Sequence, residues 1–255
     1  MGRTLTTQEL IKHKNQALSK IDNYLTKLAT DPNTKIQSKA DKLSYWIKDW
    51  TKFLEYEQNF NASSLRRYKR GEIVKVHLGY NVGSEEGGLH YCVVVEKDNS
   101  RNSPVLTVVP LTSIKKKTDL EHLRPGEIDL GNELFTNLNS KISFTQKKIE
   151  SELEELAKSL DTLADDAPLE EFNKLHSKVN KLKKEADMFG RMKDEVSKMK
   201  MGSIALVKQI RTISKIRIYD PKTNFDILSN VKLSNEKLDL IDNEVIKNFT
   251  GRKNV

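Results

Sequence analysis

The chain has 255 residues, of which 36% are hydrophobic and 31% are charged. No apolar run approaches the roughly 20 residues that a membrane-spanning helix needs, and no signal peptide is recognisable, so we expect a cytoplasmic protein with no membrane partner. The single cysteine, Cys92, excludes an internal disulfide, and its apolar surroundings predict a buried structural thiol. The net charge of +8 favours a polyanionic partner such as nucleic acid, although a solvated Lys-rich surface explains it equally well.

Residues 1–64 predict an N-terminal helical hairpin. Thr7 is placed to cap the first helix, and Asp31-Pro32-Asn33 breaks the pattern before the second. Apolar side chains recur at threes and fours in both helices, which predicts antiparallel pairing through those faces. We expect Trp46 and Trp50 in the seam; the alternative is an exposed docking surface.

A polar linker, Asn59–Ser64, precedes a group of basic residues, which are Arg66, Arg67, Lys69 and Arg70. Beside a nucleic-acid site, such residues would hold phosphates. Otherwise they form a solvated junction.

The stretch 70–112 predicts a β unit around which the rest of the chain is organised. In Glu72–Leu78, apolar residues alternate with Lys75 and His77, as in a strand with one buried face. A glycine-rich loop at 79–88 precedes the continuously apolar run Cys92–Val95, which predicts a strand covered on both faces. Val105–Leu111 and Glu127–Leu130 predict two further strands.

The segment 140–199 has a different pattern. Leucine and other apolar residues recur at alternating spacings of three and four on both sides of a turn at 165–168, which predicts an inserted, coiled-coil-like antiparallel hairpin. His176 has no second ligand in view, so we expect it to be exposed rather than metal-binding.

Strand patterns resume at Ser203–Val207 and Ile216–Tyr219, and Ser234 caps a last helix that Gly251 can end. Strands on either side of the insertion can pair and close a small barrel. The sequence therefore predicts an α+β protein: a hairpin at 1–64, then a barrel domain at 65–250 interrupted by the hairpin at 140–199.

Four segments occur in the order typical of one family. They are Arg70-Gly71-Glu72-Ile73-Val74, Val82-Gly83-Ser84-Glu85-Glu86-Gly87-Gly88, Ser103-Pro104 to Thr112, and Gln209-Ile210-Arg211-Thr212-Ile213. The chain resembles the MazF/PemK toxins of type II toxin–antitoxin systems, over roughly Lys69 to Leu130 and Met201 to Phe249. The resemblance implies a closed β-barrel of the CcdB/MazF type with a C-terminal helix, a homodimer, and a cognate antitoxin. It also implies metal-independent cleavage of single-stranded RNA, to 2′,3′-cyclic phosphate and 5′-hydroxyl ends.

The resemblance also implies site residues. Thr112 matches the family's threonine, with Ser113 beside it, whereas His90 stands where the family has arginine. We expect His90 to act as acid or base, since an unperturbed histidine has a pKa of about 6.5, although it lacks the arginine fork that grips phosphate. The expected supporting residues are Ser84, Glu85, Ser113, Gln209 and Arg211. His77 is a secondary candidate, and no metal or cofactor is expected.

Three readings of His90 and of the barrel remain open at this point. The first is an RNA-cleaving enzyme. The second is a catalytically inert RNA- or protein-binding module, in which His90 merely ends a loop. The third is a toxin that acts on a protein target, as gyrase poisons do, and affects DNA topology.

Overall fold

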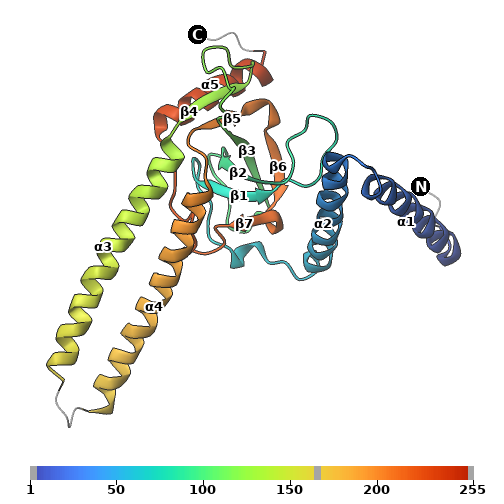
Figure 1. The fold of residues 1–255 in the computed structure, drawn as a ribbon. Coiled ribbons are helices and arrows are strands. Elements are labelled where there is room, and N and C mark those ends of the chain that lie inside the picture. The colour runs from blue at the N-terminus through green and yellow to red at the C-terminus, as the bar shows by residue number, and fades with distance from the viewer. Residues whose placement is uncertain (1–4, 164–167, 252–255) are drawn as a thin grey trace. The chain divides into compact units, whose positions relative to one another are not determined.

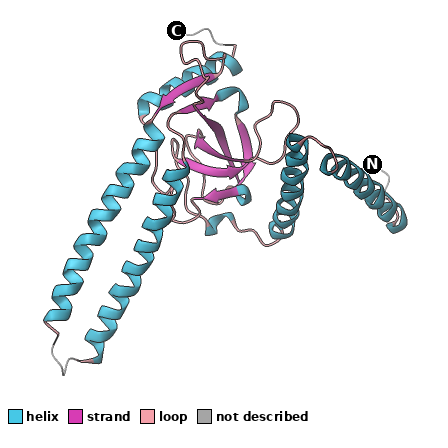
Figure 2. Cartoon of the chain, in the orientation of Figure 1, coloured by secondary structure: helices cyan, strands magenta, loops and turns pink. Residues whose placement is uncertain are grey.

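The structure, a computed structural model, describes residues 5–163 and 168–251. In these residues it is an α+β protein with five helices and an antiparallel sheet (Figure 2). The helices are α1 (Thr7–Ala29), α2 (Thr34–Glu57), α3 (Glu133–Asp161), α4 (Leu169–Lys198) and α5 (Asn235–Phe249), with short 3-10 turns η1 (Ala62–Ser64), η2 (Val207–Gln209) and η3 (Lys215–Arg217). The strands are β1 (Ile73–His77), β2 (Leu89–Val94), β3 (Val105–Ser113), β4 (Glu127–Gly131), β5 (Ser203–Leu206), β6 (Arg211–Ser214) and β7 (Ile218–Asp220).

Two compact units make up the chain. One consists of Met1–Phe60 and Gly79–Gly88, and the other of Asn61–Leu78 and Leu89–Val255. The second unit contains the whole sheet together with α3, α4 and α5. The predicted turn at 165–168 falls mainly on residues 164–167, outside the described part of the chain.

The sheet follows the strand order β4-β5-β3-β2-β1-β7, with β6 also paired to β3 (Figure 1). Among the described residues, β4 and β7 do not pair with each other, so the closed barrel that the sequence predicts is not formed. Strands from both sides of the insertion do pair, since β5 lies between β4 and β3. The prediction of a closed barrel was wrong because the two terminal strands of this order pair with different strands: β4 pairs with β5, and β7 pairs with β1.

Strand β3 is the centre of the sheet. On one edge it pairs with β2, and on the other it pairs first with β6 and then with β5. The β6 pairing reaches Val108 and the β5 pairing starts at Leu111, so η2 interrupts the ladder opposite Val109 and Pro110. Proline has no backbone N–H to donate, which suits a position beside such an interruption.

Alternate residues of β2 and β3 enter two cores, as the apolar patterns predict. Val93 and Val109 face a core shared with Leu238 of α5 and Leu134 of α3, whereas Cys92 and the residues paired around it face a core made by the strands themselves. We call these the helix-side core and the strand-side core. Cys92 is buried and is in no disulfide of the described residues, so its predicted burial is confirmed. Both faces of β2 are therefore covered.

Helices α1 and α2 leave most of their apolar side chains in solvent. Thr6 caps α1, and not Thr7 as predicted. The Thr6 hydroxyl accepts a hydrogen bond from the backbone N–H of Glu9, and the Glu9 carboxylate accepts one from the backbone N–H of Thr6. Burial is confined to the residues near the turn, which are Leu28, Ala40 and Leu43. Trp50 is 50% exposed, so its predicted place in a closed seam was wrong, and Trp46 is half-buried against Phe53.

Helices α3 and α4 lie side by side (Figure 1). Lys148 Nζ of α3 is 2.8 Å from Glu185 Oε1 of α4, which ties the two helices by an ion pair. Within their predicted seam, Leu182 is buried, whereas Leu153 is 50% and Phe172 is 47% exposed. The contact is therefore tighter toward the sheet than toward the far end.

The basic group at 66–70 serves the fold. Arg66 Nη2 donates to Glu72 Oε1 at 2.8 Å, and the two side chains are only 6% and 5% exposed. Arg70 is bound to Asp242 of α5 and to the carbonyl of Val95. Neither a phosphate clamp nor a solvated junction describes these two arginines; they join the start of β1 to its surroundings.

Replacing Glu72 tests this buried ion pair. Nε and Nη1 of Arg66 are buried without a hydrogen-bond partner in the described part of the chain, so Glu72→Ala leaves an uncompensated charge. We expect the free energy of unfolding to fall by about 3–5 kcal/mol in urea denaturation. The exposed pair of Lys174 and Glu170 supplies the control, since Glu170→Ala should cost less than about 1 kcal/mol. Equal effects of the two variants would contradict the assignment.

Tyr68 and Tyr91 should ionise later than the other five tyrosines. Burial raises the pKa of both above 10.0, and at Tyr91 the hydrogen bond and charge of Glu195 raise it further. The folded protein therefore keeps protons that the unfolded chain loses, and its stability falls as the pH rises above about 10. Alkaline absorbance titration should show two late tyrosines of seven, and Tyr91→Phe should remove one of them. Seven tyrosines titrating together would contradict this.

Candidate functional site

His90 and Thr112 meet at one end of β2 and β3. Cys92 of β2 pairs with Pro110 of β3 in an antiparallel arrangement. Continuing this register by two residues on each strand places His90 opposite Thr112, with both side chains on the same face of the sheet. His90 Nδ1 lies 3.1 Å from the carbonyl oxygen of Leu111, the residue before Thr112. The structure thus brings together the two residues that the sequence predicts as catalytic.

The hydrogen bond of His90 fixes its tautomer. A carbonyl oxygen only accepts, so Nδ1 carries the proton, and in the neutral imidazole Nε2 then holds the lone pair. The ring is half-buried.

Gln209 and Arg211 also form one group. The guanidinium of Arg211 donates to Gln209 Oε1 at 3.0 Å and to the Gln209 carbonyl at 3.3 Å. Arg211 pairs with Val108 of β3, so it projects on the same face as the strand-side core. Gln209 therefore orients Arg211.

Arg217 is a residue that sequence reasoning missed. Its Nε donates to the carbonyl of His77 at 2.8 Å. Burial lowers the pKa of Arg217, and the charge of Arg211 lowers it further, whereas Cys92 raises it. Arg211 and Arg217 therefore lie close enough to repel each other, and we call them the arginine pair. The only signal in the sequence was the position of Arg217 shortly after Gln209 and Arg211.

The arginine pair lies outside β2: Arg211 is on β6, which pairs with β3, and Arg217 is the last residue of η3. Val76 of β1 pairs with His90 on one side and with Ile218 on the other, and Arg217 immediately precedes Ile218. Strand β1 therefore lies between His90 and the segment that follows Arg217, and the bond from Nε to the His77 carbonyl holds Arg217 at the end of β1. The secondary candidate, His77, contributes its backbone carbonyl to this region through Arg217.

The glycine-rich loop is closed on itself. The N–H of Gly88 donates to the carbonyl of Gly79 at 2.7 Å, and a Cβ at Gly87 would come within 2.7 Å of the same oxygen. Ser84 and Glu85 lie on an exposed turn of this loop. Their roles in a site remain predictions.

A pocket of about 250 Å³ lies where the end of α4 meets the sheet. Ten residues line it, which are Lys75, Tyr91, Leu111, Thr112, Ser113, Glu195, Lys198, Met199, Lys200 and Ser203. Thr112 and Ser113 were predicted as site residues, whereas Glu195 and Lys198 were missed because the sequence marks them only as polar residues of an inserted helix. The insertion therefore contributes directly to a cavity beside Thr112.

Glu195 is the centre of this pocket's polar contacts. Lys75 Nζ lies 2.5 Å from its Oε1, and the hydroxyl of Tyr91 donates to the same oxygen. Burial works to raise the pKa of Glu195, but the hydrogen bonds from Lys75 and Tyr91 outweigh it and hold that pKa below the usual range. The carboxylate is therefore ionised at neutral pH.

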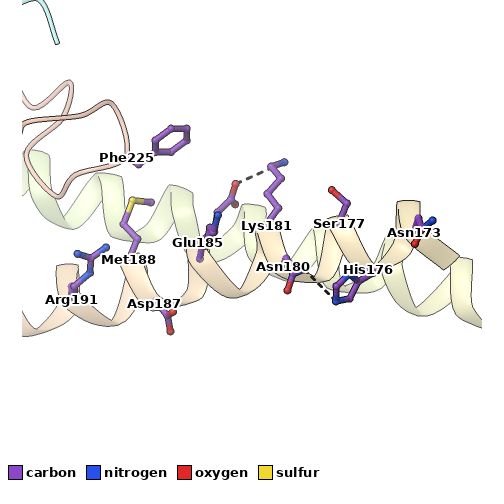
Figure 3. Close-up of a pocket in the computed structure, with 11 residues that line it drawn as sticks. Asn173, His176, Ser177, Asn180, Lys181, Glu185, Asp187, Met188, Arg191 and Phe225 are labelled. Atoms are coloured by element: carbon purple, nitrogen blue, oxygen red, sulfur yellow. Dashed lines mark hydrogen bonds and ion pairs between the residues drawn. The ribbon is translucent and has the colours of Figure 1, made fainter. Parts of the chain in front are cut away.

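A larger groove of about 770 Å³ follows α4 beside Phe225 (Figure 3). His176 lies in it, exposed as predicted, with Nε2 at 3.3 Å from Asn180 Nδ2. It shares no lining residue with the pocket at Thr112. Nowhere in the described residues do three or more His, Cys, Asp or Glu side chains gather as metal ligands.

Within residues 5–163 and 168–251, no helix is long and apolar enough to cross a membrane. The second unit contains the imidazole of His90, the hydroxyl of Thr112 and the guanidinium groups of Arg211 and Arg217. These are the groups that a phosphodiester reaction without a metal requires.

Comparison with known families agrees with the resemblance seen in the sequence. Residues 69–182 match the family described as PemK-like, MazF-like toxin of type II toxin-antitoxin system. None of the curated proteins matches the chain. The matched range runs from the start of β1 into α4, so it includes His90 and Thr112 and ends before Arg211. Over residues 69–182, a little under half of its length, this chain is similar to the PemK-like, MazF-like toxin family of type II toxin–antitoxin systems.

Proposed function

We propose that the chain is the toxin of a type II toxin–antitoxin system and cleaves single-stranded RNA at short sequences without a metal ion. The single observation that carries the proposal is the contact of His90 with Leu111 beside Thr112, within the range that matches the toxin family. The arginine pair, with Arg211 on β6 and Arg217 in η3, adds a permanent positive charge, which a histidine does not supply.

The chemistry follows from these groups. Nε2 of His90 takes the proton of a 2′-hydroxyl, whose oxygen forms a bond to the adjacent phosphorus. The bond from phosphorus to the 5′-oxygen breaks, and that oxygen receives a proton from water. Thr112 and the arginine pair donate to the phosphorane oxygens as negative charge develops. The products are a 2′,3′-cyclic phosphate and a 5′-hydroxyl.

The remaining parts of the proposal concern domains and partners. The toxin-like domain spans 65–250, preceded by a helical hairpin at 1–64 and interrupted by a second at 140–199. Its partners are single-stranded RNA, a cognate antitoxin and a second copy of the chain in a homodimer. Ser84, Glu85 and Ser113 join Gln209 and Arg211 in contacting RNA.

Cleavage assays in EDTA test the enzyme. Wild type should cut a mixed RNA pool to cyclic-phosphate ends. His90→Ala should slow cleavage by about 10²–10⁴-fold because the proton acceptor is lost, and Thr112→Ala by about 10²-fold because a donor to the phosphorane is lost. Product ends are read by their susceptibility to phosphatase and kinase.

The control is His122→Ala, because His122 is an exposed histidine that pairs with Asp119 and lies outside the proposed site. It should cleave like wild type. Wild-type protein that binds RNA but leaves a broad pool intact would favour the inert binding module. Protein that neither binds nor cuts RNA but alters DNA supercoiling would favour a gyrase-poison-like toxin.

Arg217 offers a separate test of the phosphate contacts. Arg217→Met should lower the cleavage rate by about 10²–10³-fold, and Arg217→Lys should restore only part of it, since lysine keeps the charge but lacks the planar fork. Rates at saturating and limiting RNA, together with thermal melting, separate catalysis from folding. Full activity in folded Arg217→Met would remove Arg217 from the mechanism.

A further inference from the structure

We propose that the pocket between α4 and the sheet holds one base of the RNA and favours bases that carry an amino group over uracil; the proposal rests on the RNA cleavage proposed above. The pocket is lined by the end of an inserted helix on one side and by β1, β2, β3 and β5 on the other. It is a site for reading sequence, distinct from the groups that handle the proton and the phosphate.

The size of the pocket suits a single nucleoside. Its volume of about 250 Å³ is below the range of roughly 300–1,000 Å³ usual for larger small-molecule ligands. Leu111 and Met199 supply apolar surface for the faces of a base, and Ser113 and Ser203 supply hydroxyls at its edges. One flat, polar-edged ring fits such a lining.

The carboxylate of Glu195 provides the discrimination. Lys75 and Tyr91 both donate to Oε1, which holds the side chain in one position. A carboxylate accepts at roughly four lone-pair positions, so capacity remains for N–H donors of a ligand. Adenine, cytosine and guanine each present an exocyclic amino group, whereas the edge of uracil that replaces it is a carbonyl, which a carboxylate repels.

The surroundings of the pocket suit the backbone of the same RNA strand. Lys198 and Lys200 line the pocket and are exposed, where they can contact phosphates on either side of the bound base. The pocket shares Leu111 and Thr112 with the His90 site. Tyr91 and Leu111 belong to the helix-side core, so the pocket opens on the opposite face of β2 and β3 from the His90 ring, and a base bound here belongs to a nucleotide outside the bond that is cut.

Binding of RNA analogues that cannot be cleaved tests the pocket directly. Fully 2′-O-methylated oligomers of uracil alone, and of uracil alternating with adenine, cytosine or guanine, lack the attacking 2′-hydroxyl. Fluorescence anisotropy should show wild type binding the amino-bearing oligomers about tenfold or more tightly than the uracil oligomer. In Glu195→Gln, whose amide can donate to a carbonyl, that ratio should fall to near one.

Glu185→Gln is the matched control, because Glu185 is also on α4 and pairs with a lysine, Lys148, but does not line this pocket. It should keep the wild-type ratio. Should Glu195→Gln fail to fold, Ser113→Leu fills the pocket from β3 while leaving the contacts of Glu195, and it should lower affinity for the amino-bearing oligomers selectively.

Equal affinity of wild type for all oligomers, or a uniform loss in Glu195→Gln with an unchanged ratio, would overturn the pocket and leave Glu195 as a clamp between α4 and the sheet. Selective binding without cleavage of natural RNA would keep the pocket and overturn the catalytic proposal. Absence of any RNA binding would overturn both.

Discussion

Everything in the second unit depends on the double pairing of β3. Its two edges carry β2 on one side and the β5–η2–β6 segment on the other, so its alternate residues supply both cores. The same pairing fixes the ends of neighbouring strands, and those ends carry the polar groups. His90 enters from β2, Arg211 from β6, and Thr112 from β3 itself. A shift of one residue in either register would send these side chains to the opposite face.

The site combines residues of different origin in the sequence. His90 stands where the family has arginine, and the positive charge in its neighbourhood comes from the far end of the chain, through Arg211 and Arg217. The insertion adds Glu195 and Lys198 to a pocket that borders Thr112 on the other face of the strands. In the proposed mechanism, His90 handles the proton and the arginine pair binds the phosphate, two tasks that one arginine would have to share.

The sequence predicts the local elements well and the long-range contacts poorly. The period-two pattern of Glu72–Leu78 and the apolar runs Cys92–Val95 and Val105–Leu111 predict β1, β2 and β3, because the burial of each strand depends on its own residues. Closure of the barrel depends on which strand ends meet, and no local pattern contains that information. Trp50 lies on the apolar face of its helix, but an apolar face in the sequence does not show whether a partner helix covers that position. Arg66 and Arg217 look like ordinary surface charges; only the fold brings Glu72 to one and the His77 carbonyl to the other. Likewise, the hydrogen bonds of Glu195 come from Lys75 and Tyr91, which are distant in the sequence.

The place where α3 and α4 leave the sheet has a consequence for how this chain can change. Gly131 at the end of β4 pairs with Ser203 at the start of β5, so the chain departs and returns at adjacent points. The entropic cost of closing a chain segment between two adjacent points rises slowly with the length of the segment, by about 0.6 kcal/mol for each doubling. Whole helical turns can therefore be gained or lost at the distal end without moving a strand. The end of the hairpin that lies against the sheet carries Glu195, which lines the pocket beside Thr112, so its sequence is constrained. The distal end can vary in length and sequence.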